Sequence, residues 1–229
     1  MRIYFKYTVY LFVLFGFSCA IAGSYEDFFA AIQRNDPRTV RTLLVRGFDP
    51  NTVNPKGDYA LIQALREGSP QVAMALLDSP QTKVEVRTAK DESPLMLAAL
   101  KGYLDICQKL IALDADVNKP GWAPLHYAAT GGHLAVMRIL LDNDAYIDAA
   151  SPNGSTPLMM AAGYGSLDAV KLLLEAGADP ALKNGLGFTA EDFARQVQRE
   201  QAAALIAAAL QKQLLLQPQP LPQPQPIKQ

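Results

Sequence analysis

Residues 151–182 read SPNGSTPLMMAAGYGSLDAVKLLLEAGADPAL and contain the sequence of one complete pair of helices. Thr156 and Pro157 favour a helix start, because a hydroxyl accepts an early backbone N–H and proline is tolerated in the first turn. After a glycine-rich break, leucines recur with Val170 at i, i+3 and i+4 spacing, which predicts a second helix with one buried face. Gly177 then supplies a left-handed cap. A pair this small cannot bury its apolar face alone, so it predicts neighbours of the same kind.

The same pattern recurs along the chain. Residues 93–118 and 123–149 hold two further copies, and the prolines Pro94, Pro124 and Pro157 are separated by 30 and 33 residues. A unit of about 33 residues that combines a helix start, paired alanines and a glycine is typical of a helical solenoid. In such a fold each unit packs only on its neighbours along the chain.

Two stretches resemble a known family. Residues 124–134 read PLHYAATGGHL, and residues 177–179 read GAD. These ordered positions resemble the ankyrin repeat. The resemblance implies an all-α fold, an ankyrin-repeat solenoid of about six helix-turn-helix units with short β-hairpin-like fingers.

The domain organisation follows from the repeats and from the two ends of the chain. We expect a signal peptide at residues 1–22, an ankyrin-repeat domain at residues 23–213 and a disordered Pro/Gln-rich tail at residues 214–229. The tail is interpreted as an inert solubilising segment, and a ligand for a proline-binding groove is the alternative. The expected units cover about 23–53, 54–86, 87–118, 119–150, 151–183 and 184–213.

The first 22 residues indicate export. Arg2 and Lys6 precede an apolar core, and Ala20-Ile21-Ala22 forms a small-x-small cleavage site. The alternative, an uncleaved anchor helix, is disfavoured because the apolar run is shorter than the ~20 residues that a span prefers. We therefore expect a periplasmic protein, or a secreted one, with no membrane contact after cleavage. The formal net charge of −1 gives no reason to expect a nucleic-acid partner.

The reactive residue types are few. Cys107 would be the single cysteine of the exported chain, and in the repeat register it coincides with the core positions Met137 and Val170. We interpret it as a buried apolar residue, with a reactive thiol as the alternative. The ankyrin resemblance implies that histidines such as His126 and His133 hydrogen-bond within and between repeats.

Two chemical motifs match only in part. Residues 185–190 match the dinucleotide pattern G-x-G-x-x-A, but an inter-repeat loop precedes them where a strand is required. Residues 114–118 begin like a calcium loop, but Lys119 replaces the tight-turn glycine and Leu125 the bidentate glutamate. No third metal ligand accompanies the histidines, and no G-x-S-x-G elbow occurs. We expect no catalytic residue, cofactor or metal.

A binding surface remains as the expected site. In ankyrin-like proteins partners meet the finger tips and the exposed ends of the first helices. The turn at residues 118–122 is three residues shorter than the next one, which predicts a stunted finger at Trp122. The alternative for Trp122 and Phe188 is ordinary packing over shortened or terminal fingers. Mapped onto this sequence, the resemblance implies an apolar and charged strip of Arg66, Glu67, Leu100, Lys101, Trp122, Tyr164 and Phe188.

The functional hypothesis is a non-enzymatic protein–protein interaction module. We expect an exported, monomeric scaffold or protector that binds a periplasmic protein of unknown identity through its concave face. The first alternative is a secreted host-directed effector or a toxin-neutralising, immunity-like protein. An enzyme is a remote alternative, because none of the catalytic constellations assembles.

Overall fold

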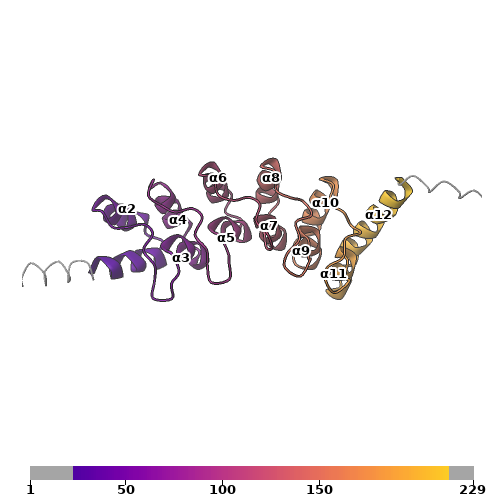
Figure 1. The fold of residues 1–229 in the computed structure, drawn as a ribbon, viewed down its shortest axis with the longest axis horizontal. Helices are drawn as coiled ribbons and strands as arrows, with labels where there is room; N and C mark the ends of the chain where they lie inside the picture. The colour runs from indigo at the N-terminus through magenta and orange to yellow at the C-terminus, as the bar shows by residue number, and fades with distance from the viewer. Residues whose placement is uncertain (1–22, 217–229) are drawn as a thin grey trace, which may run out of the picture.

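The computed structural model describes residues 23–216, and every regular element in that range is a helix. The helices follow one another in six pairs along an elongated stack (Figure 1). The first pair consists of a helix over residues 23–33 and α2 (Pro37–Val45). The later pairs are α3 (Ala60–Glu67) with α4 (Pro70–Leu77), α5 (Pro94–Lys101) with α6 (Leu104–Ala112), α7 (Pro124–Gly131) with α8 (Leu134–Asp142), α9 (Pro157–Gly163) with α10 (Leu167–Glu175), and α11 (Ala190–Gln196) with α12 (Glu200–Leu216).

The stack has two layers. The first helices α3, α5, α7, α9 and α11 lie side by side in one row, and the second helices form the other row (Figure 1). The two ends of the described chain lie at opposite ends of the stack. This is the predicted all-α ankyrin-type solenoid, in which each unit contacts its neighbours along the chain.

Side-chain caps start the first helices where the sequence predicts them. The Ser93 hydroxyl accepts the Met96 N–H at 3.2 Å, and the Thr156 hydroxyl accepts the Met159 N–H at 3.4 Å. At α11 the cap is reciprocal, because Asp192 also accepts the Thr189 N–H at 2.8 Å. These bonds satisfy backbone donors that the first turn of a helix leaves without partners.

The core runs between the two helix rows along the whole stack. Leu158 of α9 and Leu173 of α10 are fully buried. Cys107, Met137 and Val170 are each 0% exposed, which confirms that Cys107 occupies a core position of the second helix. The buried first-helix positions are often alanines, and these small side chains let the neighbouring helices pack closely.

The fingers are tight turns. The only β-type pairing in the described residues is an isolated bridge between Val53 and Tyr59. The turn at residues 118–122 lacks the backbone closure of the other fingers, which agrees with its predicted shortening by three residues. Each of the other four fingers is closed by a backbone hydrogen bond of 2.9–3.0 Å across four residues, and these bonds join Asn54 to Asp58, Thr88 to Glu92, Ser151 to Ser155 and Asn184 to Phe188.

The last helix continues past the expected end of the repeat domain. The expected boundary was Gln213, and α12 ends three residues later, at Leu216. Leucines are good helix formers and sustain the helix through Leu216. The predicted signal peptide at residues 1–22 and the remaining tail at residues 217–229 lie outside the described residues. Between residues 23 and 216 no helix has the length and hydropathy that a membrane span requires.

Candidate protein-binding surface

Arg66 connects two fingers. It lies in the last turn of α3, and its guanidinium donates to the Asp58 carboxylate at 2.8 Å and to the Glu92 carboxylate at 3.1 Å. Helical side chains tilt toward the N-terminus, so an arginine at the end of α3 can reach back to the finger before that helix. The two carboxylates are 17% exposed and the arginine is 38% exposed. The ion pairs therefore lie at the surface but are partly shielded from water.

Aromatic rings continue this arrangement into the next unit. Burial, together with the adjacent Glu92 carboxylate that hydrogen-bonds the phenol, raises the pKa of Tyr127 to about 12. The ring of Trp122 meets that of Tyr127 edge-on, with centroids 6.4 Å apart. Three consecutive units thus contribute to one continuous group. We call this group the finger cluster, and it consists of Asp58, Arg66, Glu92, Trp122 and Tyr127.

Trp122 has a packing role as well. Its ring is half-buried against the core, and its centroid lies 5.2 Å from that of His126 in an edge-on contact. The shortened turn brings the indole down onto the start of α7, as the packing alternative proposed. Because the ring is only half-buried, packing and surface exposure coexist at this residue.

The remaining predicted residues lie elsewhere on the stack. Lys101 and Glu67 are exposed at the C-terminal ends of α5 and α3, and Leu100 is half-buried beside Lys101. Tyr164 caps the end of α9 and is 59% exposed. Phe188, 38% exposed, belongs to the last finger.

The seven predicted residues therefore do not form a single strip. An eight-residue first helix such as α5 or α7 is about 12 Å long, which separates residues at its end from the finger at its start. Arg66 reaches across this distance through its long side chain. Tyr164 and Phe188 belong to units farther along the stack than the finger cluster.

Sequence reasoning did not select Tyr127. The corresponding positions of the two flanking first helices, α5 and α9, hold Leu97 and Met160, which are buried. Tyr127 is half-buried, and its hydroxyl faces Glu92. The available signal was a hydroxyl-bearing ring, one residue after the motif histidine, where the two flanking units have Leu97 and Met160.

The two histidines have structural roles, because they hydrogen-bond to backbone groups. The Nδ1 of His126 accepts the Ala123 N–H at 3.1 Å, and its Nε2 lies 3.0 Å from the Ser155 carbonyl oxygen of the next unit. These partners assign the ring proton to Nε2. His133 similarly reaches the Leu100 carbonyl of the preceding unit at 2.9 Å. The predicted hydrogen bonding within and between repeats is confirmed.

The Cys107 thiol is buried in the core, and the calcium-like segment forms hydrogen bonds with the protein itself. Burial raises the pKa of the Cys107 thiol to about 12, so the thiolate needed for nucleophilic chemistry is scarce at neutral pH. In the calcium-like segment, the Asn118 amide donates to the Asp144 carbonyl oxygen at 2.6 Å. Among residues 23–216 no group of three His, Cys, Asp or Glu side chains is arranged to hold a metal ion.

The comparisons with known proteins agree with this architecture. The family described as ankyrin repeats (3 copies) matches residues 28–120 and 95–184. The B-cell lymphoma 3 protein homolog of Mus musculus is 32% identical over 155 residues, which cover 65% of this chain and 35% of that protein. The putative ankyrin repeat protein YahD of Escherichia coli is 28% identical over 192 residues, or 80% of this chain and 95% of that one.

A third relative, a putative ankyrin repeat-containing protein of Treponema pallidum, is 28% identical over 182 residues, which cover 75% of this chain and 59% of that protein. The chain spans about a third or less of the mouse relatives it matches. Ankyrin repeats are typically non-catalytic modules that bind protein partners. The family match extends over more than half of the sequence, and it agrees with the paired helices, the fingers and the histidine bonds: the chain belongs to the ankyrin-repeat family.

Proposed function

We propose that this chain is an exported, non-enzymatic scaffold or protector that binds a periplasmic protein through the finger cluster on its concave face. The observation that carries the proposal is the convergence of an arginine, two partly shielded carboxylates and two aromatic rings from three consecutive units. Aromatic and arginine side chains are the residues most enriched at binding hot spots.

The charges of the finger cluster specify the kind of partner group. Two carboxylates face one guanidinium, so the cluster carries one surplus negative charge beside the exposed edge of Trp122. A basic side chain of the partner would pair with the carboxylates and lie against the aromatic ring. Such complementarity contributes to specificity and to the rate of association, and salt weakens it.

Mutation of the finger cluster tests the binding site. Affinity capture from the periplasmic fraction identifies a partner, and titration calorimetry then compares the wild type with Arg66→Ala, Trp122→Ala and the double variant. We expect the double variant to bind at least tenfold more weakly, which corresponds to about 1.4 kcal/mol. A thermal melt of each variant shows whether the fold is retained.

Two tyrosines provide a matched control outside the finger cluster. Tyr146 is 68% exposed and Tyr164 is 59% exposed, and neither belongs to the cluster. We expect Tyr146→Ala to bind like the wild type. If Tyr164→Ala weakens binding while the finger cluster variants do not, the partner uses the ends of the first helices. Equal binding by all variants would contradict the proposed site.

Export is supported by the sequence of residues 1–22 and is tested separately. Fractionation of cells that express the full chain, with detection of a C-terminal epitope, locates the mature protein. Intact-mass measurement shows whether cleavage follows Ala22. Retention in the cytoplasm would overturn the exported part of the proposal and leave the binding site untouched. Recovery from the medium would favour the secreted effector or toxin-neutralising alternative over the periplasmic scaffold.

A further inference from the structure

The last unit differs from the interior units in the length of its second helix. α12 has 17 residues, whereas α6, α8 and α10 have nine each. The additional eight residues extend the helix by about 12 Å. The buried residues of α12 are Ala202, Ala203 and Ile206, all near its start. The second half of α12 therefore projects beyond the packing that holds the unit in the stack.

Exposed apolar side chains are concentrated in this unit and in the loop that leads into it. Twelve large apolar side chains are exposed between residues 23 and 216, and seven of them follow Ala181. Solenoids normally end in a capping unit with a polar outer face, because no further unit covers it. The terminal unit of this chain instead combines exposed apolar side chains with exposed polar ones such as Arg195 and Gln211. The seven residues are Leu182, Leu186, Phe188, Val197, Leu214, Leu215 and Leu216.

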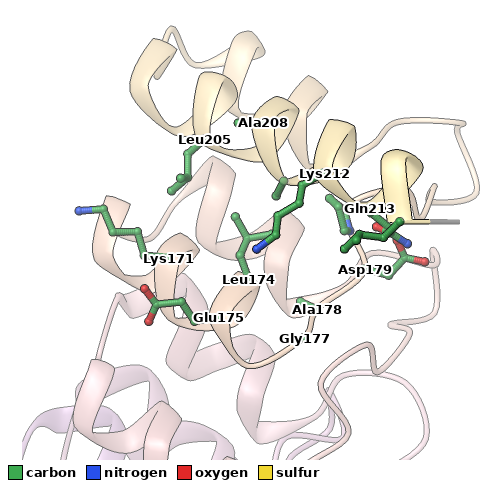
Figure 2. Close-up of a pocket in the computed structure, with 13 residues that line it drawn as sticks. Lys171, Leu174, Glu175, Gly177, Ala178, Asp179, Leu205, Ala208, Lys212 and Gln213 are labelled. Carbon is green, nitrogen blue, oxygen red and sulfur yellow. The ribbon is translucent and has the colours of Figure 1, made fainter.

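A groove of about 820 Å³ lies between the projecting part of α12 and α10 (Figure 2). Leu174 and Ala178 form one wall, and Leu205 and Ala208 belong to the opposite wall. At one end the Gln213 amide donates to the Asp179 carboxylate at 3.2 Å and ties the two walls together. The groove is therefore a defined apolar feature of the surface between two helices.

The α12 wall has the spacing of a helix-packing seam. Its lining residues follow one another at i, i+3, i+4, i+7, i+8 and i+11, and they are Leu205, Ala208, Ala209, Lys212, Gln213 and Leu216. The two alanines at the centre allow another helix to approach closely. No aromatic ring lines the groove, although such rings are what an extended proline-rich segment packs against. This disfavours the alternating Pro/Gln residues 217–229 as the occupant and favours a helix.

The charges on the groove are self-complementary. Lys171 and Lys212 line it together with Glu175 and Asp179, so both signs occur on one surface (Figure 2). An interface between identical copies related by a two-fold axis requires this property, because each patch must pair with itself. A surface that binds a strongly charged partner of another kind would carry charged side chains of one sign only.

We propose that a second copy of this chain occupies the groove. In this dimer the α12 helices of the two copies lie antiparallel, and each places its alanine-centred seam in the groove of the other. Leu214, Leu215 and Leu216 are buried at the two ends of the interface. The dimer goes beyond the binding module proposed above, replaces the monomer expected from the sequence, and leaves both finger clusters free.

Sedimentation equilibrium of the full chain at about 1–100 µM tests the dimer, with two variants of one helix as a matched pair. Ala208 lines the groove, whereas Ala204 is exposed on α12 and lies outside it. We expect the wild type and Ala204→Glu to dimerise, and Ala208→Glu to raise the dissociation constant at least tenfold. Both substitutions keep a good helix former at an exposed position, so thermal melts should match.

Deletion of residues 217–229 distinguishes the occupants. If a second copy fills the groove, the shortened chain dimerises like the full chain. Dimerisation only after the deletion would mean that the chain's own tail covers the groove, which would overturn the proposal. A full chain that stays monomeric at about 100 µM, or a dimer that Ala208→Glu leaves intact, would also overturn it.

Discussion

His126 illustrates how one side chain can hold two repeats together. Its imidazole accepts a backbone N–H from its own unit and faces a carbonyl oxygen of the next. The bond from Ala123 needs the neutral ring, because a proton on Nδ1 would face the Ala123 N–H. Burial lowers the pKa of His126, so the folded chain resists protonation of this residue.

The lowered pKa of His126 predicts that the stability of the fold depends on pH. The unfolded histidine binds a proton below about pH 6.5, whereas the folded one does so only at lower pH. The free energy of unfolding, measured by urea titration, should therefore fall between pH 7 and pH 5. We expect His126→Gln to lose most of this slope, since glutamine does not titrate. His133→Gln is the matched control and should keep it; an identical slope in all three proteins would contradict the role assigned to His126.

At the scale of elements, a ladder of polar side chains joins successive units. We call it the inter-unit ladder, and it consists of Asn51, Glu85, Asn118 and Asp148. Each of these side chains accepts a backbone N–H about 30 residues further along the chain, from Lys83, Asp116, Tyr146 and Asp179 respectively. The ladder repeats because the loop that follows the second helix of each unit lies beside the equivalent loop of the next unit.

The ladder uses both charged and neutral side chains. Burial raises the pKa of Glu85, and the N–H of Asp116 partly offsets that effect by favouring the carboxylate. Asn118 makes the same kind of bond without a charge, at 2.8 Å to the Tyr146 N–H. Asn118 is therefore the suitable position for a test that does not depend on pH.

Substitution of Asn118 measures how much one member of the inter-unit ladder contributes to the free energy of unfolding. Asn118→Ala removes the bond to the Tyr146 N–H and the bond to the Asp144 carbonyl, and should lower the free energy of unfolding by about 1–2 kcal/mol. The control is Asn143→Ala, whose amide bonds only the Ile139 carbonyl of its own helix. We expect a smaller loss there by chemical denaturation. Equal losses would mean that the inter-unit bond adds nothing beyond a local one.

At the scale of the molecule, stability comes from contacts between adjacent units. The core is continuous from Phe28 to Ile206, although no single unit has a core of its own. In such a stack the free energy is close to a sum over units and their interfaces. Residues beyond the last packed unit should therefore matter little to the folding of the monomer.

Deletion of residues 217–229 tests this expectation. These residues follow α12, whose packing against the core is completed near Ile206. The melting temperature at low protein concentration, followed by circular dichroism at 222 nm, should change by less than about 2 °C. A change of 5 °C or more would mean that these residues contribute to the fold.

The local pattern of the sequence determined the helices, their caps, the turn lengths and the register of the core. Ser93 and Thr156 start helices because capping involves neighbouring residues, and Cys107 could be placed by its repeat position alone. The finger cluster was only partly predictable. Arg66 and Trp122 were identified from their slots, but Tyr127 and the links through Glu92 were not, because they join residues of different units.

The tertiary structure alone decided which surface residues meet. The reach of Arg66 to Glu92 depends on the distance between adjacent first helices, and no property of either residue in the sequence specifies it. The end of α12 and the groove beside α10 likewise depend on how the last helix leaves the stack. The repeat period determines which core positions of one unit pack against the equivalent positions of the next. Contacts between surface side chains of different units depend on the geometry of the whole solenoid.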